Sequence, residues 1–232
     1  MFSPDLLAEI RSRFAHVDTC PFEGPRVFFE NAGGALTLNS VVQTSTTFAA
    51  IPDNQGRDNP ASRALMDIIA KARADMAEFM NAPGGQVIVG ESGTEMLFRM
   101  IRAACMAAPA GPVIGSTLEH PASRSAAVLW AEHSGRSYIS VPHNDATGCV
   151  TPDDYRPHLR PDLAVATILH TSPVTGMGVD VAAIAAEIRA VAPQCLIIVD
   201  GIQHAAHGGI DLTALGVDGY AISPYKMFSR HG

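Results

Sequence analysis

Lys226 follows a short apolar run and a turn, a setting that could make its amine chemically useful. The run Tyr220 to Ile222 leads into Ser223 and Pro224, and the lysine comes two residues after that proline. A lysine held beside a buried strand is partly desolvated, which lowers its pKa and frees the amine to attack a carbonyl carbon. Most lysines are solvated surface residues, so a chemical role for Lys226 is supported only by the residues around it.

Asp200 ends the apolar run 196–199, and a carboxylate at the end of a buried strand needs a compensating partner. It either caps the following turn or holds a cationic group of a ligand. Gln203 could reach the same ligand. Asp200 with His204 and His207 could also form a metal cluster, but one short helix supplies too few ligands, so we predict no metal site.

The stretch ESGTE, residues 91–95, opens a predicted helix and could hold an anion. The backbone N–H groups of Gly93 and Thr94 would lie at the positive end of the helix dipole, where a phosphate or carboxylate binds. Ser92 could equally be an ordinary N-cap. The stretch also nearly fits the hydrolase motif G-x-S-x-G, and the common nucleotide fingerprints are absent.

A lysine, a strand-end aspartate and a phosphate cradle together form the set that a pyridoxal phosphate site requires. The lysine forms a Schiff base with the cofactor, the aspartate keeps the pyridine nitrogen protonated, and the cradle holds the phosphate. The sequence therefore predicts a pyridoxal 5′-phosphate enzyme.

Alternating helices and strands must bring these residues together. Helices are expected over 3–14, 59–82, 92–108, 121–135 and 180–193. Strands are expected over 26–31, 84–90, 111–116, 136–142, 162–170, 194–200 and 219–223. Several of these strands are continuous apolar runs, which is typical of strands buried on both faces of a mostly parallel sheet. This predicts an α/β fold of three layers, with helices on both faces and ligands beyond the carboxyl ends of the strands.

The composition narrows the class of protein. The chain has 232 residues, 47% of them hydrophobic, and a formal net charge of −7 with acidic and basic residues interspersed. Without a basic run, no nucleic acid partner is expected, and no apolar run approaches the ~20 residues of a membrane span. The four cysteines lie far apart, which favours reduced thiols in a cytoplasmic protein: Cys20, Cys105, Cys149 and Cys195.

Six stretches resemble, in the same order, the large domain of class V aminotransferase-like enzymes, a group that includes cysteine desulfurases, selenocysteine lyases and isopenicillin epimerase-like proteins. They are FFENAGGAL, ESGTEMLFRMIRAA, EHPASRSAAVLW, HTSPVTGMGVDVAAIAAEIR, IIVDGIQHAAHGGIDLTALGVDGYAIS and SPYK. The resemblance implies a fold-type I large domain over residues 26–232, after an N-terminal helical segment over residues 1–25. It also implies that the chain is truncated after the cofactor-binding lysine, before the small C-terminal domain of the relatives.

The resemblance implies a role for each matching residue. Lys226 would carry pyridoxal 5′-phosphate as an internal aldimine, and Asp200 would pair with the pyridine nitrogen. Gln203 would bond the phenolic oxygen of the ring, and His120 would stack on the ring face. The phosphate would be held by Ser92, Gly93, Thr94 and Ser223. The substrate side would be formed by Asn31, Ala32 and Gly33.

Two departures leave the reaction open. Pro173 stands where many relatives have an asparagine, and Tyr225 where many have a histidine. None of the cysteines matches the nucleophilic cysteine of desulfurases. Transamination, elimination, desulfuration and epimerisation of an amino acid or amine remain possible, in a full-length enzyme that resembles its relatives in forming a homodimer. Two alternatives stand beside this hypothesis: an inactive or cofactor-free interaction module, and a hydrolase that uses Ser92 but leaves Lys226 and Asp200 unexplained.

Overall fold

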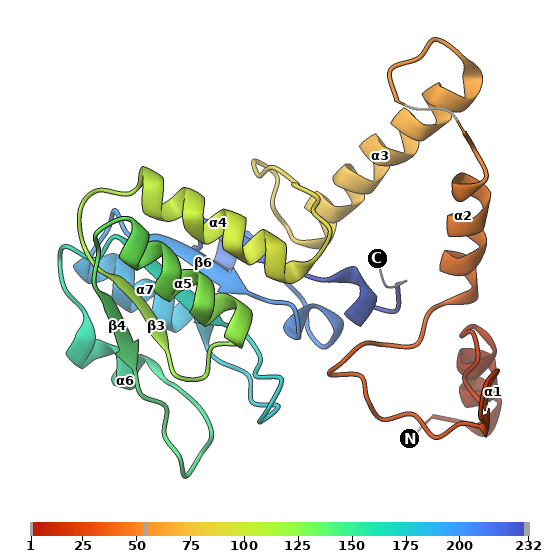
Figure 1. The fold of residues 1–232 in the computed structure, drawn as a ribbon. Helices are drawn as coiled ribbons and strands as arrows, with labels where there is room; N and C mark the ends of the chain where they lie inside the picture. Colours follow the sequence, from red (N-terminus) through yellow and green to blue (C-terminus); the bar gives the residue numbers. More distant parts are fainter. Residues whose placement is uncertain (1, 53–54, 230–232) are drawn as a thin grey trace. The chain divides into compact units, whose positions relative to one another are not determined.

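A computed structural model of the chain describes residues 2–52 and 55–229 (Figure 1). The chain divides into two compact units, one of residues 1–79 with 224–232 and the other of residues 80–223. Among the described residues, no helix combines the length and the apolar character needed to cross a membrane. The expected boundary between residues 25 and 26 stays a prediction.

The unit of residues 80–223 is built on a sheet of five described strands, all parallel, in the order β4-β3-β5-β6-β7. The strands are β3 (Val113–Ser116), β4 (Tyr138–Val141), β5 (Val165–Leu169), β6 (Leu196–Asp200) and β7 (Gly219–Ala221). Since β4 and β5 lie on opposite sides of β3, the chain changes its direction across the sheet between β3 and β5. Such a switch point opens a crevice beyond the carboxyl ends of the strands.

Helices cover both faces of this sheet (Figure 1). They are α4 (Gly93–Ala107), α5 (Pro121–His133), α6 (Pro152–Tyr155), α7 (Val181–Val191) and α8 (Leu212–Leu215). Successive strand residues face opposite sides: Val113 is buried in a cluster with residues of α4 and α5, whereas Ile114 is buried in another with residues of α7. The predicted three-layer α/β fold is confirmed.

The unit of residues 1–79 with 224–232 is mainly helical in its described part. It contains α1 (Pro4–Ser12), β1 (Thr19–Cys20), β2 (Gly24–Pro25), α2 (Asn39–Ala49), α3 (Pro60–Phe79) and a short 3-10 turn, Pro224–Lys226. Ser3 caps α1, because its Oγ accepts a hydrogen bond from the Leu6 N–H at 3.2 Å. Helix α2 lacked a sequence signal, since its run of threonines and valines has low helix propensity.

The strands predicted over 26–31 and 84–90 do not form in the described part of the chain. A strand needs a neighbouring backbone to complete its hydrogen bonds, and no described strand pairs with either segment. Their apolar side chains are consequently exposed, with Phe29 at 93% and Val89 at 74% of full accessibility. An apolar run alone was therefore insufficient to predict a strand.

Candidate functional site

The carboxyl ends of the parallel strands carry several of the residues predicted to bind a cofactor. In the unit of residues 80–223, His120 lies four residues after β3. Asp200 is the last residue of β6, and Ser223 lies two residues after β7. Since parallel strands end at one edge of a sheet, the fold places side chains from distant parts of the sequence along that edge.

Gly93 and Ser223 lie side by side where α4 begins. A Cβ atom on Gly93 would lie 2.4 Å from the Ser223 Oγ and 2.4 Å from the Ile202 Cδ1, closer than atoms can approach. The Ser92 Oγ accepts a hydrogen bond from the Glu95 N–H at 3.1 Å, so Ser92 is the N-cap of α4. Only a glycine lets the first amides of this helix approach the Ser223 hydroxyl. Ser92 and Thr94 are exposed beside them.

Asp200 lies at the carboxyl end of β6, between β5 and β7, and is almost fully buried, at 2% exposure. It lies in register with Leu169 on one side and Ala221 on the other. Its Oδ1 accepts a hydrogen bond from the Ile202 N–H at 3.1 Å. Gln203, also buried, follows one short turn later. A carboxylate in such a low-dielectric setting interacts strongly with a cationic group. A protonated ring nitrogen would be such a group.

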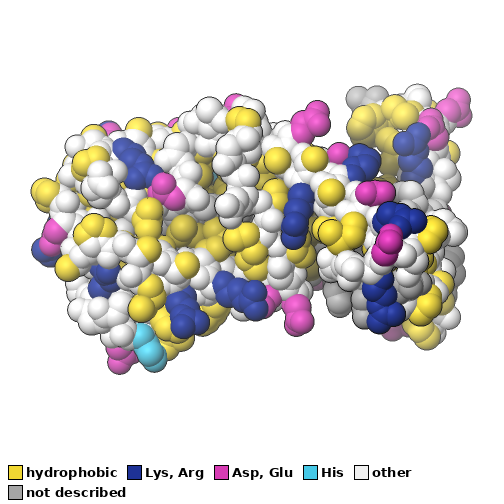
Figure 2. Space-filling view, turned by 90° about the horizontal axis from the view of Figure 1, so that it is seen from above, with side chains coloured by type: hydrophobic (Ala, Val, Ile, Leu, Met, Phe, Trp, Pro, Cys, Tyr) yellow, Lys and Arg dark blue, Asp and Glu magenta, His cyan; other side chains and the backbone are white. Residues whose placement is uncertain are grey.

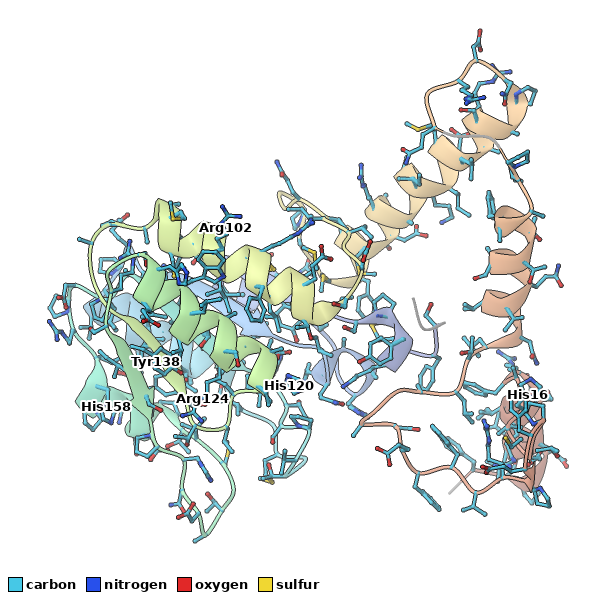
Figure 3. All side chains as sticks on the ribbon, viewed as in Figure 1. His16, Arg102, His120, Arg124, Tyr138 and His158 are labelled. Atoms are coloured by element: carbon cyan, nitrogen blue, oxygen red, sulfur yellow. The ribbon has the colours of Figure 1, made fainter. Side chains whose placement is uncertain are left out.

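His120 is the N-cap of α5, and its ring is fixed by a local hydrogen bond (Figure 3). The His120 Nδ1 accepts from the Ala122 N–H at 3.1 Å. Since an accepting nitrogen carries no proton, the neutral ring carries its proton on Nε2. Pro121 at the first helical position stabilises the same turn. The half-buried ring therefore has a defined orientation and tautomer.

Glu119 precedes His120 and was not singled out from the sequence. Its side chain is buried, at 5% exposure. Burial, and secondly the charge of Asp200, raises the pKa of Glu119 to about 7 despite hydrogen bonds that favour the charged form. Its position could have pointed to it from the sequence, because it is an acidic residue between an expected buried strand and the start of an expected helix.

A stacked pair of histidines lies beside Asp200. The centres of the His170 and His204 rings are 3.4 Å apart, and the angle between the ring planes is 9°, so the rings are nearly parallel. The His170 Nδ1 and the Tyr220 hydroxyl are 2.7 Å apart, and the His204 Nδ1 and the Thr171 hydroxyl 3.0 Å apart. Burial, followed by the neighbouring His204, lowers the pKa of His170 to about 4. The stack and the contact with Thr171 hold the His204 ring in place.

We expect His170 to make the protein less stable in acid. Its pKa of about 4 in the folded chain lies below its ordinary value of 6.5, so the unfolded chain binds more protons between these pH values. The free energy of unfolding should therefore fall as the pH drops through this window, relative to a His170→Asn variant, which does not titrate. Urea unfolding of both proteins at about pH 7.5 and about pH 4.5 measures the difference.

The comparison with the variant is needed because Glu119 acts in the opposite direction. The pKa of Glu119 is raised from 4.5 to about 7, so the free energy of unfolding falls as the pH increases through that range. This pH range overlaps the one in which His170 has its effect. Glu119 is common to both proteins, so its contribution largely cancels in the difference. A difference between wild type and His170→Asn that stays constant with pH would contradict the prediction.

Lys226 and the predicted substrate-side residues belong to the other unit, which joins two distant stretches of sequence. The Ala35 N–H donates to the Tyr225 carbonyl at 3.1 Å, and the Leu38 N–H donates to the Phe228 carbonyl at 3.0 Å. Asn31, Ala32 and Gly33 form the exposed turn just before this contact. Lys226 is half-buried, and its Nζ lies 5.8 Å from the centre of the Tyr225 ring.

Sequence comparison relates almost the whole chain to one family. A profile of the family described as "Aminotransferase class-V" matches residues 27–232. The chain is 28% identical over 214 residues to the cysteine desulfurase CsdA of Escherichia coli, covering 89% of this chain and 52% of that protein. It is also 28% identical over 216 residues to the cysteine desulfurase-like protein ustD of Aspergillus flavus, covering 90% and 48%. The chain thus spans about half the length of these relatives.

Solved structures share the fold. The crystal structure of E. coli cysteine desulfurase CsdA matches with a TM-score of 0.79 at 23% identity, covering 100% of this chain and 57% of that one. The apo structure of the cysteine desulfurase of Thermococcus onnurineus matches with a TM-score of 0.83 at 18% identity, covering 98% and 54%. Their agreement with the helix-covered parallel sheet confirms the predicted fold-type I architecture. Since the family profile also covers nearly all of the sequence, the chain belongs to the aminotransferase class-V family.

Proposed function

We propose that this chain forms the cofactor-binding part of a pyridoxal 5′-phosphate enzyme that acts on an amino acid or an amine. The observation that carries the proposal is the close approach of Gly93 to Ser223, where a side chain on residue 93 would overlap the serine hydroxyl. It brings the first amides of a helix beside a hydroxyl group, and such groups together suit one small anion. Membership of the aminotransferase class-V family supports this assignment.

The residues present fit the chemistry of pyridoxal phosphate. The amides of the first turn of α4, with Ser92, Thr94 and Ser223, suit a phosphate group. The buried Asp200 suits the protonated ring nitrogen, and Gln203 is three residues away for the phenolic oxygen. His120, with its tautomer set by the Ala122 amide, presents an aromatic ring for stacking.

Each of these residues would have a defined task in catalysis. Bound pyridoxal phosphate supplies a ring that accepts electrons from the substrate's α-carbon. Asp200 would keep a proton on the ring nitrogen. Lys226 follows Ser223 by three residues, so the chain limits how far its amine can lie from the phosphate group. That amine would hold the cofactor and, when free, would accept a proton from the α-carbon.

The reaction is proposed as transamination, elimination, desulfuration or epimerisation, with the turn Asn31–Gly33 on the substrate side. Two relatives carry the name cysteine desulfurase or cysteine desulfurase-like, so cysteine is the first substrate to test. On the face seen in Figure 2, basic side chains are interspersed with acidic and apolar ones, as suits a small-molecule ligand better than a polyanion. The homodimer and the cytoplasmic location stay predictions.

Gly93→Ala should weaken binding of pyridoxal phosphate about tenfold, because the added methyl group displaces the Ser223 hydroxyl and narrows the anion site. Titration with the cofactor, followed by visible absorbance and circular dichroism, measures the affinity. Gly84→Ala is the matched control, since a Cβ there meets no atom within 4 Å. A wild-type protein that binds no pyridoxal phosphate would refute the function. Equal cofactor affinities of Gly93→Ala and wild type would refute the proposed anion site at Gly93 and Ser223.

A further inference from the structure

The buried Glu119 side chain connects three elements at the switch point of the sheet. Its Oε1 accepts a hydrogen bond from the Leu169 N–H at 2.9 Å and a longer one from the Ser116 Oγ at 3.4 Å. The Ser123 Oγ donates to its Oε2 at 2.7 Å. One carboxyl group thus joins the ends of β3 and β5 to the first turn of α5.

The hydrogen bond between the Leu169 N–H and Glu119 takes the place of pairing that is missing between β3 and β5. The register of β3 with β4 runs on to Ser116, but the register of β3 with β5 stops at Ile114 and Ala166. Beyond that point β5 no longer pairs with β3. The His170 N–H still donates to the Asp200 carbonyl on β6, at 3.0 Å. The Leu169 N–H, which faces the other way along the strand, is satisfied by Glu119 instead.

Along the chain, His120 lies between Glu119 and Ser123, whose side chains make this connection. Glu119 holds the backbone just before it to β5, and Ser123 holds the helical turn just after it to the same carboxyl group. We propose that Glu119 is a positioning residue, which fixes the place and direction of the His120 ring by fastening the first turn of α5 to the end of β5. This inference rests on the proposed function, in which His120 stacks on the cofactor ring.

The environment of Glu119 favours hydrogen bonding over a permanent charge. In the described part of the chain, the titratable groups that interact with it are Asp200 on β6, Tyr138 on β4 and Tyr155 on α6, and none of these three is cationic. The Leu169 N–H donates to one oxygen of the carboxyl group, and the Ser123 hydroxyl, a group that can both donate and accept, pairs with the other. A glutamine can make the same two contacts, so Glu119→Gln should restore what Glu119→Ala removes.

The test compares Glu119→Ala and Glu119→Gln with wild type by two measurements. In the protein without cofactor, the imidazole resonances of His120, assigned with a His120→Gln variant, should shift in Glu119→Ala and stay near wild type in Glu119→Gln. With pyridoxal phosphate added, the dissociation constant should increase about tenfold in Glu119→Ala and less than about threefold in Glu119→Gln. The visible circular dichroism of the bound cofactor should change only in Glu119→Ala.

Asp218→Ala is the matched control. The Asp218 Oδ2 accepts from the Ile197 N–H at 2.7 Å, the same kind of contact at the opposite end of the sheet. This variant should lower the melting temperature but leave the His120 resonances and the cofactor affinity unchanged. A shift of His120 in Asp218→Ala as large as in Glu119→Ala would overturn the inference, because any loss of stability would then suffice.

Two further results would overturn it. In the first, His120 keeps its wild-type resonances in folded Glu119→Ala. In the second, Glu119→Gln behaves like Glu119→Ala, which would assign the effect to charge. If Glu119→Ala does not fold, Ser123→Ala removes the α5 end of the connection alone, and unchanged His120 resonances there also count against the inference. The resonance measurement needs no cofactor, so a protein that binds no pyridoxal phosphate refutes the proposed function but still tests the position of His120.

Discussion

Lys226→Ala is expected to abolish covalent attachment of pyridoxal phosphate. Borohydride treatment of the cofactor-loaded wild-type protein should fix a pyridoxyl group on Lys226, because only an amine bonded to the cofactor's aldehyde carbon is reduced to a stable product. In Lys226→Ala the visible absorbance of the bound cofactor should shift toward that of the free aldehyde, and turnover of any amino acid should be lost. Peptide mapping by mass spectrometry locates the label.

The sequence itself supplies the control for this experiment. It contains two lysines, Lys71 and Lys226. Lys71 lies on α3, where its ammonium group is exposed and 2.6 Å from a carboxylate oxygen of Asp75. Lys71→Ala should therefore keep the label and the absorbance of the wild type. A pyridoxyl group found mainly on Lys71, or a label of wild-type yield in Lys226→Ala, would show that the assignment of Lys226 is wrong.

Asp200→Asn is expected to retain some cofactor binding and to lose most of the turnover, on the order of 10²-fold or more. An amide of the same shape can still contact the ring nitrogen, but it carries no charge to keep that nitrogen protonated. Without the proton the ring accepts electrons from the α-carbon poorly. Single-turnover spectra with cysteine and with a panel of other amino acids measure the loss, and cofactor titration measures the remaining affinity.

Asp180→Asn is a suitable control for the loss of one carboxylate. The Asp180 side chain caps α7 by accepting from the Ala183 N–H at 3.0 Å, and asparagine caps helices equally well. Its turnover and cofactor affinity should match those of the wild type. Full turnover in Asp200→Asn would remove Asp200 from the role of ring-nitrogen partner. Equal losses in both variants would mean that the effect of Asp200→Asn is unspecific.

Much of the fold was predictable because burial leaves a local pattern in the sequence. The continuous apolar runs of β5 and β6 require cover on both faces, and the helix between them, α7, follows from its own periodicity. The same reasoning failed for 84–90, where the apolar run is present but no described strand lies beside it. It also missed α2, whose β-branched residues resemble a strand as much as a helix.

The sequence by itself determined the types of group available for chemistry and their order along the chain: an acid at the end of one apolar run, a lysine after another, and a glycine at a helix start. Only the tertiary structure decided which groups touch. The contact of Glu119 with Leu169 exists because the pairing of β5 with β3 stops before Leu169. The stack of His170 on His204 exists because β5 and β6 lie side by side. The physical reason is that burial depends on local periodicity, whereas hydrogen bonds and ring contacts between strands depend on which distant segments pack together.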